Sequence, residues 1–212
     1  MTKPVFVISG LPGCGNSSVA RALASRLGLN YFSPGNLFKS VANGSYKTQP
    51  YAKTFVEMCE EMSIQIPQFS LDKDNETQAA NQLWQSEFGK SKEFHELIDR
   101  MQTELASRGG YVIEGKLSIW KIKTPAFKVW LKASFEKRAE RVAERERIAL
   151  DEAKEMLERK EKIERKEWKR IYGFDYVEQE KLADLVLDTT DKSQFEIADE
   201  IVATAREKGI LS

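Results

Sequence analysis

The feature that most constrains this chain is a glycine-rich stretch between an apolar run and a helical pattern. The stretch reads Gly10-Leu11-Pro12-Gly13-Cys14-Gly15-Asn16-Ser17-Ser18. An apolar run over 5–8 precedes it, and apolar residues at four-residue spacing follow it from 19 to 27. Strand, glycine-rich turn and helix is the context of a phosphate-binding loop, where backbone N–H groups and the helix N-terminus surround phosphate oxygens. The stretch therefore favours a phosphate site on the first strand.

One position departs from the usual loop pattern. Asn16 stands where a lysine is expected, while Ser17 supplies a hydroxyl at the place that ligates Mg²⁺ in such loops. A tight structural turn between strand and helix is the alternative interpretation. Cys14 lies near a helix N-terminus, which tends to lower the pKa of a thiol, but we interpret it as a filler of the loop.

Composition argues against several classes of protein, among them nucleic-acid binders, disulfide-rich proteins and membrane proteins. The chain has 212 residues, which suits one domain with a small inserted subdomain, and it carries 33 basic and 33 acidic residues. Zero net charge gives no global field that would attract nucleic acid, so we expect none as a partner. Two cysteines and the single His95 argue against a disulfide framework, a histidine metal site and a Ser-His triad. Without a signal-peptide pattern or a long apolar span, we expect a cytoplasmic protein that does not bind membranes.

Five short apolar runs with helical patterns between them predict an α/β fold, a doubly wound five-stranded parallel sheet. The runs cover 5–8, 29–32, 111–113, 127–131 and 185–187. Ligands bind at the carboxyl ends of such strands. The residues at those ends include a glycine loop, a hydroxyl, cations and carboxylates, namely Gly10, Ser33, Glu114-Gly115-Lys116, Lys132 and Asp188-Thr189. This order of residues already points to a phosphoryl-transfer site.

Two further regions read as helical. Between the second and third strands, patterns over 77–88 and 94–105 predict an insertion that projects from the sheet. The very charged stretch 135–172 predicts a helix pair, whose arginines we interpret mostly as a solvated face with i,i+4 ion pairs. A terminal amphipathic helix is expected over 195–205.

Several blocks in register resemble the archaeal-type cytidylate kinases, a branch of the nucleoside monophosphate kinases. The resemblance covers nearly the whole chain except about residues 45–90, and it rests on blocks 8–15, 27–39, 98–102, 112–117, 129–133, 138–146, 169–175 and 184–189. It implies one P-loop kinase domain over 1–212, with an acceptor subdomain at 33–108 that includes an enlarged 45–90 insertion, and a mobile lid at 146–172. The implied reaction converts ATP and CMP or dCMP into ADP and CDP or dCDP with Mg²⁺.

The resemblance also implies roles for individual residues. The loop Gly10–Ser18 would bind ATP, with Ser17 as the metal ligand. Asp99 would orient cations or reach the base of the acceptor. The catalytic cations would be Lys116 and the lid arginines Arg141 and Arg145, with Arg159 or Arg165. The acceptor nucleotide would contact Ser33, Gly35, Lys39, Asp99, Arg100, Gln102, Gly115 and Lys116.

Departures from the family pattern leave alternatives open. Lys39 and Lys116 stand where the family usually has arginine, and the lid pattern Arg-Glu-x-x-Glu-x-x-Arg here reads from Lys160 to Glu167. With Asn16 in the loop as well, we expect a slow enzyme unless another cation compensates. The alternatives are a kinase for AMP or UMP, a catalytically weakened ATP-binding scaffold, and a kinase that acts on a non-nucleotide or polynucleotide acceptor. We expect a monomer.

Overall fold

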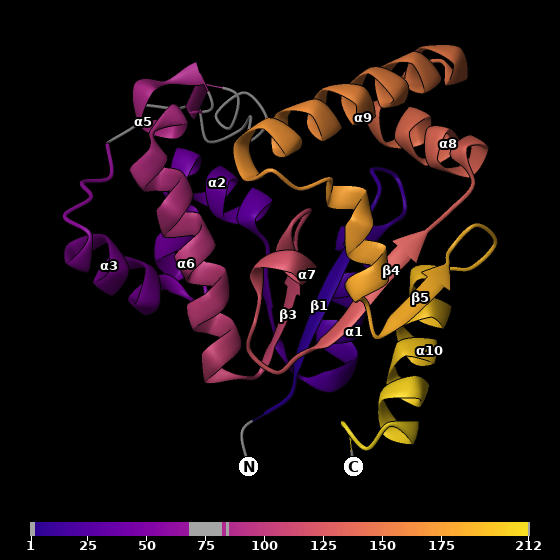
Figure 1. Ribbon diagram of the computed structural model, residues 1–212, viewed down its shortest axis with the longest axis horizontal. Coiled ribbons are helices and arrows are strands. Elements are labelled where there is room, and N and C mark those ends of the chain that lie inside the picture. The colour runs from indigo at the N-terminus through magenta and orange to yellow at the C-terminus, as the bar shows by residue number, and fades with distance from the viewer. Residues whose placement is uncertain (1–2, 68–81, 84, 212) are drawn as a thin grey trace.

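A five-stranded parallel sheet forms the centre of the molecule (Figure 1). The computed structural model describes residues 3–67, 82–83 and 85–211. The order of the strands across the sheet is β2-β3-β1-β4-β5, which confirms the predicted doubly wound fold. The strands are β1 Val5–Gly10, β2 Asn30–Phe32, β3 Tyr111–Glu114, β4 Phe127–Lys132 and β5 Leu185–Asp188. Each lies where an apolar run predicted it.

Helices cover both faces of the sheet because β1 directs alternate side chains to opposite sides. Val5 and Val7 belong to an apolar cluster with residues of α2, α3, α6 and α7, whereas Phe6 and Ile8 belong to a second cluster with residues of α1 and α10. The helices on the first face are α2 Pro34–Asn43, α3 Ala52–Glu61, α6 Lys92–Arg108 and α7 Ser118–Lys121, and those on the second are α1 Asn16–Leu27 and α10 Gln194–Glu207. All six residues of β1 are buried, as a central strand covered on two faces requires.

The insertion between β2 and β3 is helical where the structure describes it. The 3-10 turn η1 Ser45–Thr48 leads into α3, and the short α5 Glu87–Lys90 leads into α6. The helix expected over 94–105 therefore forms as part of α6. Of the helix expected over 77–88, residues 82, 83 and 85 and the start of α5 are described and helical, and the remainder lies outside the described residues.

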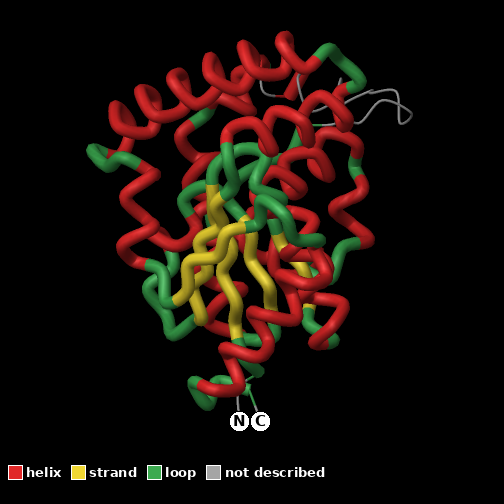
Figure 2. Tube along the Cα trace, turned by 90° about the vertical axis from the view of Figure 1, so that its right-hand side faces the viewer, coloured by secondary structure: helices red, strands yellow, loops and turns green. Residues whose placement is uncertain are grey.

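The charged helix pair lies across the carboxyl ends of the strands. Helix α8 Phe135–Glu146 and the long α9 Leu150–Tyr172 pack on each other through a small apolar cluster around Val142 and Leu157. Figure 2 shows α9 running over the upper edge of the sheet, while both termini lie at the opposite end. The 3-10 segment η2 Tyr176–Leu182 returns the chain to β5. In the part of the chain that the structure describes, no helix has the length and apolarity needed to span a membrane.

Candidate active site

The loop after β1 is shaped by two glycines with left-handed backbone angles. Gly13 has φ of 84° and Gly15, which precedes α1, has φ of 87°. A Cβ added at Gly13 would lie 2.8 Å from the Cβ of Arg138, so a side chain has no room there. The N–H of Cys14 donates to the carbonyl oxygen of Leu11 at 3.2 Å, which closes the turn. The loop therefore places consecutive backbone N–H groups at the N-terminus of α1, the geometry that binds phosphate.

Asn16 holds the loop together. Its Nδ2 donates to the carbonyl oxygens of Gly10 at 3.1 Å and Leu11 at 3.2 Å. Its Oδ1 is buried and has no hydrogen-bond partner among the described residues. The amide is thus used within the turn, and the loop contributes no cationic side chain of its own.

Ser17 lies beside a carboxylate at the end of β3. The hydroxyl of Ser17 donates to Glu114 Oε2 at 3.1 Å, and the hydroxyl of Tyr31 donates to the same oxygen at 3.1 Å. Burial and the charge of Glu114 raise the pKa of Tyr31, so it remains a donor at neutral pH. The described residues contain no group of three His, Cys, Asp or Glu side chains placed to bind a metal. A hydroxyl and one carboxylate fit Mg²⁺, which takes one or two protein ligands and completes its shell with phosphate oxygens and water.

The other side of the loop is tied to the segment after β5. Arg141 of α8 donates to the hydroxyl of Thr189 at 3.0 Å and, more distantly, to the carbonyl oxygen of Gly13 at 3.4 Å. The hydroxyl of Thr189 in turn donates to the carbonyl oxygen of Cys14 at 2.9 Å. Cys14 is fully buried, and burial raises the pKa of its thiol to about 11 despite the nearby arginines. The thiol therefore fills the loop, as expected, and the helix N-terminus does not make it acidic.

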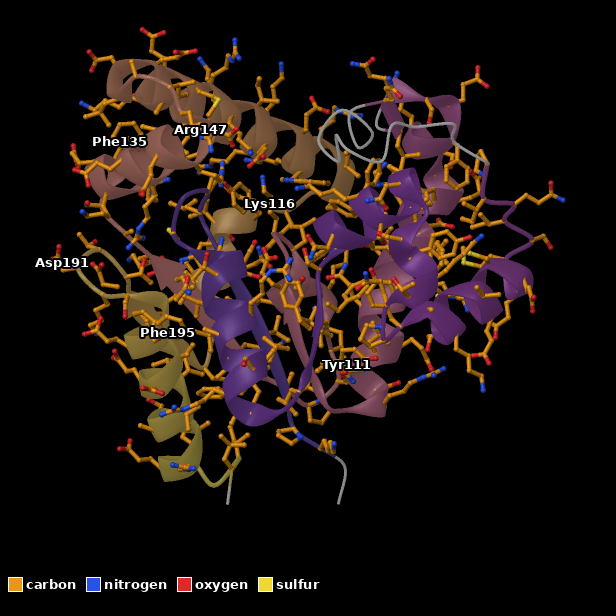
Figure 3. All side chains as sticks on the ribbon, turned by 180° about the vertical axis from the view of Figure 1, so that it is seen from behind. Tyr111, Lys116, Phe135, Arg147, Asp191 and Phe195 are labelled. Carbon is orange, nitrogen blue, oxygen red and sulfur yellow. The ribbon has the colours of Figure 1, made fainter. Side chains whose placement is uncertain are left out.

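A cleft of about 720 Å³, the main cleft, opens over the loop and extends to the start of α10. Figure 3 shows Lys116 near the carboxyl ends of the strands and Phe195 at the start of α10. The lining of the main cleft includes the loop from Pro12 to Val19 and Glu114. Its cationic side chains are Lys116, Arg141, Arg145, Lys160 and Lys192.

Two carboxylates of α9 form ion pairs with cationic side chains elsewhere in the chain. Glu161 forms an ion pair with Arg138, and Glu164 forms one with Lys116. Arg138 also donates to the carbonyl oxygen of Pro12 at 3.2 Å, so α9 is connected to the loop. Burial lowers the pKa of Lys116, and the charge of Glu164 opposes that shift. The predicted lid is thus joined to the site by charge pairs.

The predicted catalytic cations separate into two groups. Lys116, Arg141 and Arg145 line the main cleft together with the loop. Arg159 is exposed on α9 and does not line that cleft. Arg165 donates from Nε to Asp175 Oδ2 at 3.2 Å, which raises the pKa of Arg165 and lowers that of Asp175. In this conformation, Arg159 and Arg165 lie outside the group that faces the loop.

The acceptor residues predicted near β2 and β3 lie at the same edge of the sheet. Ser33 is buried and occupies the N-cap position of α2, although its hydroxyl makes no capping hydrogen bond. Gly35 and Lys39 are exposed on α2. Gly115 lies so close to α7 that an added Cβ would be 2.5 Å from Ser118 Oγ. The side chains of Ser118 and Pro34 therefore leave little room for a Cβ after Glu114.

The acceptor residues predicted on α6 lie apart from the loop. Asp99 and Arg100 line a second cleft of about 390 Å³ between α3 and α6. Asp99 accepts a hydrogen bond from Lys121 Nζ at 2.6 Å, and Arg100 pairs with Glu61 at 3.3 Å. Gln102 is buried, and its Oε1 accepts from the hydroxyl of Ser118 at 2.6 Å. The structure therefore does not bring Asp99, Arg100 and Gln102 into the cleft that contains the loop.

Two residues that the sequence places at strand ends, Glu114 and Thr189, belong to the site, and so does Lys160, which the sequence marks only as the start of the lid pattern. Glu114 accepts a hydrogen bond from the hydroxyl of Ser17, Thr189 bridges the loop to β5, and Lys160 lines the main cleft from α9. Glu114 and Thr189 each end or follow an apolar run, a signal that was visible in the sequence. Lys160 occupies the first position of the lid pattern, but its neighbour Arg159 was equally plausible there.

Comparison with known proteins agrees with this geometry. Residues 5–191 match the cytidylate kinase-like family. The chain belongs to that family. A cytidylate kinase of Methanocaldococcus jannaschii is 32% identical over 190 residues, which covers 88% of this chain and 88% of the relative. A cytidylate kinase of Methanopyrus kandleri is 34% identical over 203 residues, covering 91% and 88% respectively.

Solved structures support the fold. Shikimate kinase from Acinetobacter baumannii in complex with shikimate superposes with a TM-score of 0.54 at 16% identity, covering 98% of this chain and 95% of that one. A structure from Thermus thermophilus named TT1252 superposes with a TM-score of 0.55 at 18% identity over 100% of both chains. At such identities the likeness concerns the fold alone. This member of the cytidylate kinase-like family thus has a kinase-type α/β core.

Proposed function

We propose that this protein transfers the terminal phosphoryl group of ATP to CMP or dCMP, giving ADP and CDP or dCDP. The proposal rests chiefly on the hydrogen bond from Ser17 to Glu114 at the mouth of the glycine loop. This hydrogen bond brings a hydroxyl and a carboxylate oxygen together beside the backbone N–H groups of the loop, and Ser17, Glu114 and Lys116 line the same cleft. Family membership supports the choice of a nucleoside monophosphate as acceptor.

The reaction forms one P–O bond and breaks another. An oxygen of the acceptor's phosphate attacks the γ-phosphorus of ATP, and the bond from that phosphorus to the oxygen bridging to the β-phosphorus breaks, so that ADP leaves. Because little covalent chemistry is required of the protein, catalysis depends on positioning and on neutralising charge. The loop from Gly10 to Ser18 holds the donor phosphates through its backbone N–H groups. Arg141 and Arg145 face the same space from α8.

Mg²⁺ fits beside the loop, where Ser17 and Glu114 would hold it. When bound, it neutralises charge on the β- and γ-phosphates. Tyr31 fixes the carboxylate of Glu114 through its hydroxyl, 3.1 Å away, and so orients the ligand oxygen. Because Glu114 also accepts from Ser17, one carboxylate aligns both protein ligands.

The acceptor binds, in this proposal, on the β2–β3 side of the cleft. Lys116 meets its phosphate, with Ser33, Gly35, Lys39 and Gly115 around it. Asp99, Arg100 and Gln102 belong to α6, so their participation requires α6 and the predicted acceptor subdomain, 33–108, to close towards the loop. Closure of the predicted lid, 146–172, would exclude water from the transfer. We expect the enzyme to act as a cytoplasmic monomer.

Two observations favour a second candidate, an ATP-binding protein with weakened catalysis. The amide of Asn16 is engaged by loop carbonyls, and Lys116 is engaged by Glu164. If this candidate holds, ATP binds but no acceptor is phosphorylated.

An ADP-release assay with ATP and Mg²⁺ separates these candidates. The acceptors to test are CMP, dCMP, UMP, AMP, GMP and dTMP, with ATP binding measured in parallel. We expect turnover with CMP and dCMP. Turnover with UMP or AMP instead would support the kinase reaction but assign a different acceptor. ATP binding without turnover for all six would replace the kinase proposal by the second candidate.

A further inference from the structure

The loop of this protein lacks a charge that phosphate-binding loops usually carry. A loop lysine normally reaches the β- and γ-phosphates of the donor. Here Asn16 occupies that position, and its amide donates hydrogen bonds to the carbonyl oxygens of Gly10 and Leu11. A donor triphosphate would therefore meet backbone N–H groups but no cation from the loop itself.

One of the cations that line the main cleft has no hydrogen bond or ion pair to the described part of the chain. Each of the other four already contacts a protein group: Lys116 pairs with Glu164, Arg141 bonds to Thr189, Arg145 pairs with Glu146, and Lys192 pairs with Glu200. Lys160 forms no hydrogen bond or ion pair with any residue that the structure describes. It is therefore the cleft's available ammonium group.

The position of Lys160 on α9 directs it at the loop. Leu157, one turn earlier, is buried and lines the same cleft, and Glu164, one turn later, reaches Lys116. Residues three or four apart lie on one face of a helix, so Lys160 belongs to the face that covers the site. Glu164 would be its natural i,i+4 partner, but Glu164 is taken by Lys116. The helix thus presents an uncompensated positive charge to the cleft.

Two lysines with one carboxylate between them make a site suited to an added anion. Lys116 and Lys160 line the same cleft, and the charge of Lys160 lowers the pKa of Lys116. Two like charges that face one cleft favour a ligand that carries the opposite charge. A polyphosphate bound to the loop would supply it.

We propose that Lys160 replaces the missing loop lysine and neutralises the terminal phosphates of the donor from α9. This inference rests on the proposed kinase function. The ammonium group carries three donors on a flexible stem, so it can follow the phosphorus as charge shifts to the leaving oxygen. Because the charge arrives on α9 and not on the loop, the site is complete only when α9 covers it.

The test compares the kcat of Lys160→Met with that of two control variants, Lys160→Arg and Lys162→Met. Removing one preorganised donor typically lowers kcat about 10²–10³-fold, and we expect Lys160→Met to lose about 100-fold. Lys160→Arg should keep the rate within a few-fold. Lys162→Met removes the same charge from an exposed position of α9 and should leave the rate unchanged. A Lys160→Met rate within three-fold of the wild-type rate, or an equal loss in Lys162→Met, would overturn the proposal.

Moving the charge back to the loop gives an independent readout. In the background of Lys160→Met, Asn16→Lys should restore the rate at least ten-fold, and the affinity for ATP should recover with it. If Asn16→Lys alone is as fast as the wild type but fails to rescue Lys160→Met, Lys160 does not perform the role of the loop lysine. A wild-type protein without turnover for any nucleoside monophosphate would instead refute the kinase function, so the two failures are distinguishable.

Discussion

The ion pair between Lys116 and Glu164 predicts that α9 and the acceptor compete for one cation. Glu164→Gln keeps the shape of the side chain and removes its charge. In the ligand-free protein, Lys116 then loses its counter-ion in a site where burial already lowers its pKa. The acceptor's phosphate, in contrast, no longer has to displace a carboxylate.

The free energy that the ion pair between Lys116 and Glu164 contributes follows from its burial. The side chain of Lys116 is 34% exposed and that of Glu164 is 17% exposed, so water screens the pair only in part. A hydrogen bond to a charged group under these conditions contributes about 2 kcal/mol. For a chain of this size, that loss lowers the midpoint of thermal unfolding by roughly 4–8 °C. If CMP must break the pair to bind, removing the pair tightens CMP binding by roughly 30-fold.

Thermal unfolding with and without saturating CMP measures both effects. We expect Glu164→Gln to melt below the wild type in the absence of CMP and the difference to shrink when CMP is bound. Glu167→Gln is the matched control, since Glu167 pairs with Arg170 at 2.8 Å on the exposed side of α9. Its effect should be below about 0.5 kcal/mol. An equal CMP dissociation constant for Glu164→Gln and the wild type would refute the competition.

Three further substitutions or reactions test the packing around the site. Tyr176 is fully buried and its hydroxyl has no partner among the described residues, so Tyr176→Phe should raise the free energy of unfolding by about 1 kcal/mol; a lower melting temperature would reveal a hidden hydrogen bond. With a pKa of about 11 and no exposure, the Cys14 thiol should resist iodoacetamide at pH 8 in the folded protein, and rapid labelling seen by mass spectrometry would contradict this. Gly13→Ala forces a side chain into φ of 84° against Arg138 and should destabilise the protein by at least about 2 kcal/mol in denaturant unfolding, whereas a neutral effect would argue against the loop geometry.

The sequence by itself determined the fold and the loop. Each of the five strands is an apolar run bounded by turn residues, and such runs are local signals of burial on both faces of a sheet. The glycines at 13 and 15 are likewise readable, because only glycine adopts their backbone angles without strain. Since parallel strands end at one edge, the convergence of Ser17, Glu114 and Lys116 was also predictable.

The tertiary structure alone decided which charges act in the site. Adjacent residues on a helix point about 100° apart, so nothing in the charged pattern of α9 says whether Arg159 or Lys160 faces the loop. The rotation of α9 is set by Leu157 and by its pairing with α8. Arg159 and Lys160 are both exposed, but only Lys160 lines the cleft. Lys116 finds its partner, Glu164, only because α9, which is distant in the sequence, lies across the sheet. Secondary structure follows from local periodicity, whereas ion pairing follows from distances that only packing creates.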